Sequence, residues 1–255
     1  MIRPLLGDAL GDGSFRFRLG VAPADAVAWL ALRSDPARVE ARRNVFARHP
    51  ERLSGSAEEL VDVDSFFGTI GPPDGGFEDG ARRLAADLFV VRRSDTRVVG
   101  IAVAFPSGFA PERLVGRELR SVHAVVPGLE EAIGPQIEGF LARIPAGRSF
   151  ARVNAGLAGD PGLDRHPAAD VPALAADTPL DRLVVRLEEQ LFLGLSSHVL
   201  FAIHLVIVPF VELEADERRL VARWAGSMPP EVAHYKGITP VMARFEEFTL
   251  ESGSE

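Results

Sequence analysis

Apolar residues recur at three- and four-residue steps in several stretches of the chain, which is the spacing of a helix with one buried face. The longest such stretch is 127–144, where Pro127 is expected to open the helix. A second helix is expected over 35–50, with Asp35 as its N-cap and a histidine–proline pair at its end. Shorter helical patterns lie at 24–32, at 78–88, from 214 onward and near 240–250.

Other segments have the patterns of strands. Residues 182–188 alternate in polarity, which is the period of a half-buried strand. Residues 198–208 are apolar on both faces, so we expect a central strand there, paired with 182–188 and covered on each side. The remaining expected strands are 89–93 and 97–105, which a short turn joins into a hairpin, and 150–154.

Glycine and proline mark the connections between these elements. Residues 68–80 contain two prolines and five glycines, which predicts an exposed loop. Residues 158–179 are expected to run over the surface. About five strands, mostly antiparallel, with helices inserted between them and appended after them, define the α+β class.

The chain has 255 residues, of which 47% are hydrophobic, and these values are typical of a globular protein. We expect one domain over 1–255, with a short disordered tail at about 251–255. The sequence contains no cysteine. This excludes disulfides, thiolate metal sites, iron–sulfur clusters of the usual kind and a cysteine nucleophile.

Charge and hydropathy also limit the partners. The net charge is −8 and Lys236 is the only lysine, so no basic stripe for nucleic acid is present. The longest apolar run, 199–208, is interrupted by His204 and is shorter than the roughly 20 residues that span a bilayer. The first 20 residues contain Asp8 and Asp12 where a signal peptide is apolar, so a cytoplasmic location is expected.

Common catalytic motifs are absent from the sequence: it has no glycine-rich dinucleotide or phosphate loop, no serine-hydrolase elbow and no H-E-x-x-H. Adjacent carboxylates occur at 130–131, 188–189 and 246–247. Neighbours on a helix diverge by about 100°, and neighbours on a strand point to opposite faces. We therefore interpret these pairs as solvated edges rather than as acid–base pairs.

Histidines supply the candidate chemistry. His198 and His204 share one face of a strand but lie about 20 Å apart, so they cannot bind the same ion. His204 is either a hydrogen-bonded core residue or part of a cavity wall. His123, among small apolar residues before the long helix, either ligates a cofactor iron or caps a turn. Tyr235 and Lys236, each the only residue of its type, stand side by side.

Five segments in order resemble the heme-dependent oxidative N-demethylase family, and the resemblance extends over about 15–250. The first two are Val98-Val99-Gly100-Ile101-Ala102-Val103-Ala104-Phe105-Pro106-Ser107 and Val122-His123-Ala124-Val125-Val126-Pro127-Gly128. The other three are Arg152-Val153-Asn154, Arg186-Leu187-Glu188-Glu189-Gln190 and Pro229-Pro230-Glu231-Val232-Ala233-His234-Tyr235-Lys236-Gly237. The catalytic subunit of that family resembles a PAS domain converted to hold a heme.

The resemblance implies a PAS-like curved antiparallel sheet with inserted and flanking helices and a heme b in an apolar pocket. His123 would be the axial ligand of the iron. Further expected cofactor-binding residues are Arg117, Arg120, Arg152 and Asn154. His204 is expected to line the pocket, and Tyr235 and Lys236 to make polar contacts near the substrate or the heme propionates.

The family's activity implies the remaining partners. In the family, dioxygen activated at the iron removes a methyl group from a small amine as formaldehyde. For this chain we expect a heme-dependent oxidoreductase or monooxygenase that acts on a small amine or a related small molecule. Electrons would come from a separate flavin or iron–sulfur reductase, because this chain has neither motif. A homodimer is possible on the sequence, which does not decide the oligomeric state.

Three departures from the family pattern favour functions other than oxidative demethylation. His204 and Leu205 stand where the family has arginine and threonine, Ala155 replaces a tryptophan, and Gly108-Phe109 replace an arginine and a tryptophan. These changes predict a wider, less polar pocket. The alternatives are a PAS-like heme or small-molecule sensor without turnover, and an accessory subunit without cofactor.

Overall fold

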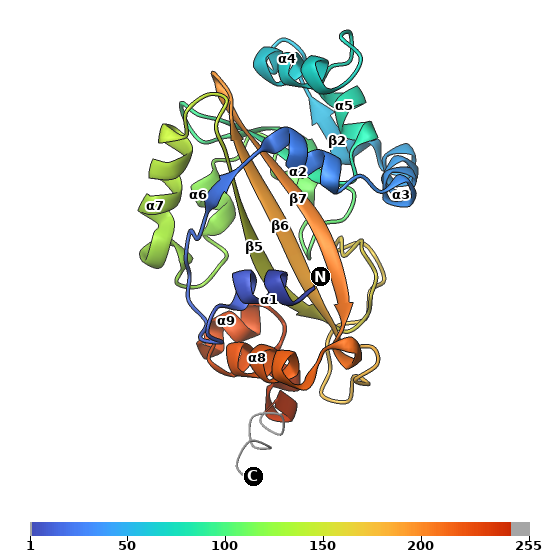
Figure 1. The fold of residues 1–255 in the computed structure, drawn as a ribbon, viewed down its shortest axis with the longest axis vertical. Coiled ribbons are helices and arrows are strands. Elements are labelled where there is room, and N and C mark those ends of the chain that lie inside the picture. The colour runs from blue at the N-terminus through green and yellow to red at the C-terminus, as the bar shows by residue number, and fades with distance from the viewer. Residues whose placement is uncertain (1, 246–255) are drawn as a thin grey trace.

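One antiparallel sheet organises residues 2–245, the part of the chain that the computed structural model describes (Figure 1). Its strands are β1 (Ala22–Ala24), β2 (Leu53–Gly55), β3 (Asp87–Arg92), β4 (Val98–Ala102), β5 (Ser149–Ala158), β6 (Val184–Gly194) and β7 (His198–Pro209). Their order across the sheet is β1-β5-β6-β7-β3-β4-β2, with every neighbouring pair antiparallel. The mixed helix-and-sheet class is confirmed, as is the central position of β7. A PAS-like identity stays a prediction.

Helices surround the sheet. They are α1 (Ile2–Leu10), α2 (Ala26–Leu32), α3 (Pro36–Arg48), α4 (Val61–Ile70), α5 (Phe77–Arg83), α6 (Leu119–His123), α7 (Leu129–Arg143), α8 (Ala215–Gly226) and α9 (Pro230–Tyr235). Short 3₁₀ turns are η1 (Pro50–Arg52), η2 (Pro111–Arg113), η3 (Phe210–Glu212) and η4 (Thr239–Val241). None of the helices within 2–245 is long and apolar enough to cross a membrane.

The register of the strands separates two faces of the sheet, because paired residues share a face and neighbours along a strand alternate. On the closed face, side chains such as Leu191 and Ala202 pack against α2 and α3, and Leu187 and Val208 pack against α1 and α8. On the other face, which we call the cavity face, Phe201 stacks on Phe192 at a centroid distance of 4.7 Å.

Helix α7 covers part of the cavity face. The ring of Phe140 packs edge-on against Phe150 and Phe192, each at a centroid distance of 5.5 Å. Figure 1 shows α6 and α7 together beside the long strands, with α8 and α9 at the end where β7 finishes. The helix predicted over 127–144 is thus confirmed, although it starts after Gly128 and contains Pro135.

Local signals explain the helix predicted over 35–50. The Asp35 carboxylate accepts hydrogen bonds from the backbone N–H groups of Ala37 and Arg38, and the helix ends at Arg48. The same helix buries Arg42, which donates to the Asp87 carboxylate of β3. This ion pair fastens α3 to the sheet.

The loop predicted over 68–80 is confirmed only at 71–76, since α4 extends to Ile70 and α5 begins at Phe77. Gly80, inside α5, serves packing. A Cβ atom at Gly80 would come within 2.2 Å of the Phe67 ring, so glycine lets the two helices approach closely. The short strands β1 and β2 and the helix α1 were not predicted. The expected tail at 251–255 lies outside the described residues, as does most of the helix expected near 240–250.

Candidate functional site

A cavity of about 680 Å³ opens on the cavity face, between the sheet, α6, α7, α9 and the segment 15–20. Its volume is in the range of cofactor and small-molecule sites. One part of its wall is apolar and is lined among others by Phe109, Leu129, Ile133, Phe140, Phe192 and Phe201. The other part is polar, with Arg18, Arg152, Asn154, Arg186, Glu188, Gln190, Tyr235 and Lys236.

His123 lies on the wall of this cavity, at the last residue of α6. Gly128, in the left-handed region at φ 73°, then turns the chain into α7. The His123 side chain makes no hydrogen bond or ion pair with any residue between 2 and 245. Burial lowers the pKa of its imidazole, and the positive charge of Arg152 lowers it further. The lowered pKa favours the neutral ring, which has a nitrogen lone pair available to a ligand.

Arg152 fixes the polar part of the cavity. Its Nε donates to Gln190 Oε1 at 2.7 Å, and its Nη1 donates to the carbonyl oxygens of Arg18 and Leu19 at 3.1 and 3.2 Å. Its Nη2 has no hydrogen-bond partner among the described residues. Burial lowers the pKa of this guanidinium. Arg152 thus joins β5 to the N-terminal segment and keeps one nitrogen for a ligand.

Glu188 is the carboxylate at the centre of the polar wall. Its Oε1 accepts from Ser107 Oγ at 2.9 Å, and its Oε2 accepts from Asn154 Nδ2 at 3.2 Å and from Gln190 Nε2 at 3.0 Å. Its negative charge adds to the raised pKa of Tyr235 and opposes the lowering of the Lys236 pKa by burial. The polar wall nevertheless has more cationic than anionic side chains, so it favours a ligand with negative charge.

Helix α9 brings Tyr235 and Lys236 to the cavity. Burial is the main cause of a raised pKa at Tyr235, so its phenol stays protonated at neutral pH. Burial lowers the pKa of the Lys236 ammonium group, and Arg152 adds to this effect. The Lys236 Nζ donates to the Ala155 carbonyl at 3.4 Å. Because β1 pairs with residues 149–151 of β5, the part of β5 that contains Ala155 is an edge of the described sheet.

Three predicted site residues lie away from the cavity. His204 is on the closed face, where its Nδ1 lies 3.2 Å from Glu189 Oε2, because β7 residues of even number point there while Phe201 points into the cavity. Arg120 pairs with Glu130 at 2.8 Å and is exposed. Arg117 is exposed as well. The structure brings together His123, Arg152, Asn154, Tyr235 and Lys236 only.

The departures from the family pattern have different surroundings. Phe109 places a ring in the cavity, 6.1 Å from the Phe89 ring. Gly108 has a φ of 94°, and a Cβ there would meet nothing within 4 Å. Ala155 is 3% exposed and packs in the core with residues of α1 and α8. Sequence reasoning missed Glu188, which lies in the cavity, and Glu189, which is only 7% exposed, so the solvated-edge interpretation of this pair is wrong.

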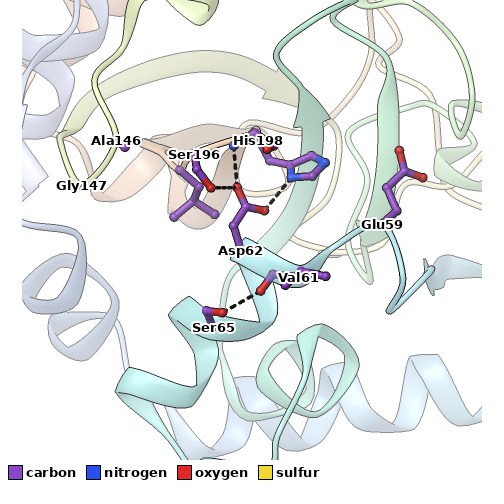
Figure 2. A pocket seen from close by; sticks show the side chains of 10 residues that line it. Glu59, Val61, Asp62, Ser65, Ala146, Gly147, Ser196 and His198 are labelled. Carbon is purple, nitrogen blue, oxygen red and sulfur yellow. Dashed lines mark hydrogen bonds and ion pairs between the residues drawn. The ribbon is translucent and has the colours of Figure 1, made fainter.

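A second, more open pocket of about 550 Å³ lies at the hairpin between β6 and β7 (Figure 2). Asp62 of α4 accepts from Ser196 Oγ at 3.0 Å and Ser197 N at 2.7 Å, and its Oδ1 lies 2.6 Å from His198 Nδ1. The His198 Nε2 is buried without a partner. Within 2–245, no three His, Asp or Glu side chains are grouped so as to hold a metal ion.

Comparison with known protein families identifies the family of this chain. Residues 77–245 match the model of a family described as "Haem-dependent oxidative N-demethylase, alpha subunit-like". The match covers about two thirds of the chain and includes His123, Arg152, Glu188 and Lys236, so the chain belongs to this family. No curated protein matches the chain.

Proposed function

We propose that this protein is a heme-dependent oxidoreductase that removes a methyl group from a small amine, with dioxygen as oxidant and electrons from a separate reductase. One observation carries the proposal. The imidazole of His123, which makes no hydrogen bond with any described residue, lies on the wall of a large cavity that is apolar on one side and cationic on the other. Membership of the family supports the same chemistry.

The residues at the cavity fit a heme. A porphyrin needs a largely apolar slot, one axial ligand and cations for its two carboxylates. The stacked rings of Phe192 and Phe201 supply part of this apolar slot. His123 would hold the iron, and Arg152 would bind a propionate through its unpartnered Nη2. Asn154 would assist by holding Glu188 in place.

When bound, the heme would supply activation of dioxygen and one-electron chemistry. The residues of the chain would position the substrate and exclude water. The phenol of Tyr235 would donate a hydrogen bond to a group in the cavity. The rings of Phe109 and Phe140 would keep the apolar side free of water. Because His204 lies on the closed face, it would have no contact with the substrate.

An ultraviolet–visible spectrum of the full chain, purified with heme supplied, tests the proposal. We expect a Soret band that shifts on reduction with dithionite and again with carbon monoxide, since an open coordination position is needed for oxygen. A folded protein with a featureless spectrum would contradict it and favour the cofactor-free accessory subunit. Heme without consumption of any methylated amine, in the presence of a reductant, would favour the sensor.

Variants connect the spectrum to the site. His123→Ala should lose heme or shift the Soret band, because no other described histidine lines this cavity. His49→Ala is the matched control, since its side chain is 44% exposed, pairs only with Glu51 and lies outside the cavity. An unchanged spectrum of His123→Ala would remove His123 from the role of axial ligand.

A further inference from the structure

Lys236, the only lysine among 255 residues, has an unusual position. It follows the last residue of α9 and its amine lines the cavity. Among the described residues, the Nζ has a single hydrogen-bond acceptor, the Ala155 carbonyl at 3.4 Å, and it lies 6.0 Å from the centre of the Trp224 ring. No carboxylate of the described residues forms an ion pair with it. An ordinary surface lysine is hydrated and charged, whereas this one is partly buried.

We propose that Lys236 is a carbonyl-reactive amine that condenses with a small aldehyde entering the cavity. The geometry supports this assignment, because at most one N–H of the amine is used by the protein and the rest of the group faces the cavity. Lysines act as nucleophiles in protein sites when they are desolvated or lie near another cation, and both conditions hold here.

The charged groups around the amine agree with that role. Burial lowers the pKa of Lys236, Arg152 lowers it further, and Glu188 acts in the opposite direction. The net direction is downward, so a larger fraction of the amine is uncharged at neutral pH than for a hydrated lysine. Glu188 and the Tyr235 phenol also line the cavity, and the charge of Glu188 influences the pKa of both Tyr235 and Lys236. The carboxylate of Glu188 can accept a proton during the condensation, and the phenol of Tyr235 can donate one.

The condensation is balanced without any oxidant. The lone pair of Nζ forms a bond to the carbonyl carbon while the carbon–oxygen π bond breaks, and a proton moves from nitrogen to oxygen to give a carbinolamine. Protonation of the hydroxyl group then releases water, and the nitrogen lone pair forms the carbon–nitrogen double bond of an iminium ion. Hydrolysis reverses both steps, so the adduct is temporary.

The aldehyde of interest is formaldehyde, the product of the demethylation proposed above, and this part of the inference rests on the proposed function. Lys236 would then hold the released carbon beside the site where it forms. The reactivity of the amine itself depends on the cavity alone. It can therefore be measured with added formaldehyde, whether or not the protein contains heme.

The experiment treats the purified full chain with formaldehyde and cyanoborohydride at about pH 7. Cyanoborohydride reduces the iminium ion to a stable N-methyl group, which adds the mass of one CH₂ unit. The peptide covering 224–244 then reports on Lys236, and the N-terminal peptide reports on the α-amino group as an internal reference. The matched reference is the same chain unfolded in guanidinium chloride. We expect Lys236 to be labelled faster in the folded chain, roughly tenfold for each unit by which its pKa is lowered.

Variants separate specific reactivity from mere access. Lys236→Arg should abolish labelling of that peptide. Arg152→Met should slow the labelling of Lys236, because a like charge is removed, whereas Arg48→Met, at an exposed position on α3, should not change it. Labelling no faster than in the unfolded chain would overturn the proposal. Equal rates in Arg152→Met and Arg48→Met would overturn the electrostatic role of Arg152. Heme content, measured separately, decides the proposed function independently of either result.

Discussion

Glu188 and Glu189 are neighbours on β6, yet they meet opposite surroundings. On the closed face, Glu189 is 7% exposed and binds both Arg33 and His204. The Arg33 guanidinium also stacks on the Trp29 ring, 4.1 Å from its centre. On the cavity face, Glu188 is bound by neutral groups of Ser107, Asn154 and Gln190. Nearby, the Nη2 of Arg152 makes no hydrogen bond with any described residue.

The difference separates a structural cluster from a binding site. The closed-face carboxylate is paired inside the protein, so removing its charge leaves the Arg33 guanidinium without its partner, which is costly at a buried site. A polar wall with unused donors beside an apolar wall is arranged for a group that the chain itself does not supply. Three experiments test whether the two faces differ in this way.

The largest loss of unfolding free energy is expected for alanine substitutions at two adjacent residues of β7 that point to opposite faces. Leu200 is fully buried in the closed-face core, so Leu200→Ala should lower the unfolding free energy by about 3 kcal/mol. Phe201→Ala should cost about 2 kcal/mol or less, although its side chain is larger, because one side of its ring borders the cavity. Urea unfolding of both variants measures the two losses. A greater loss for Phe201→Ala would show that the cavity face is packed as tightly as the closed face.

A smaller effect is expected from the two carboxylates. Glu189→Gln should lower the unfolding free energy by about 2 kcal/mol at pH 7, since Arg33 and His204 lose their buried partner. Glu188→Gln should cost under about 1 kcal/mol, because Glu188 borders an open cavity and has neutral hydrogen-bond donors. Urea unfolding measures both. Equal losses would contradict the division into two faces.

The same pair has an expected dependence on pH. Hydrogen bonds and charges from His204 and Arg33 hold the pKa of Glu189 below its usual value, against the opposing effect of burial. The stabilisation is thus present above the unfolded-state pKa, near 4.5, and is lost as pH falls through the lower folded-state value. The difference between wild type and Glu189→Gln should therefore shrink as pH decreases from about 5. A difference that is constant down to pH 3 would exclude the ionised carboxylate as its cause.

The smallest effect concerns the cavity face alone. Because Arg152 lowers the pKa of His123, Arg152→Met should raise it, and the proton NMR titration of the His123 ring would show the midpoint at higher pH. Arg48→Met, at an exposed position on α3, is the control variant and should leave the midpoint of His123 where it is. A midpoint of His123 that does not move would mean that Arg152 and His123 do not share one electrostatic environment.

Local signals in the sequence were sufficient for the elements that carry them. The Asp35 cap, the apolar stripe of α7 and the alternation of β6 each predicted an element close to its observed place. The strands β1 and β2 have three residues each and exist only through pairing with β5 and β4, so no local pattern indicates them. The loop predicted around Gly80 was wrong because glycine there serves helix packing rather than a turn.

The site was predicted only in part, for a related reason. The two-residue period correctly placed His198 and His204 on one face of β7, but it does not say which face is hollow. That depends on the helices packed far away in sequence: α2 and α3 fill the side of His204, while α7 leaves space beside Phe201. Glu188 escaped prediction because its partners Ser107 and Asn154 are 81 and 34 residues distant.

Arg152 joins two parts of the protein through one rigid group. Its guanidinium is planar, so the directions of its nitrogens are fixed relative to one another. Two of them are held by Gln190 and by the carbonyl oxygens of Arg18 and Leu19, and the third faces the cavity. Residues 18–19 form an N-terminal strap that lies outside the residues matching the family. Their carbonyl oxygens nevertheless help to fix the orientation of this third nitrogen. Relatives that share His123 and Arg152 but differ in the strap would therefore present the same charge at a different angle, and could select different ligands with an identical set of core residues.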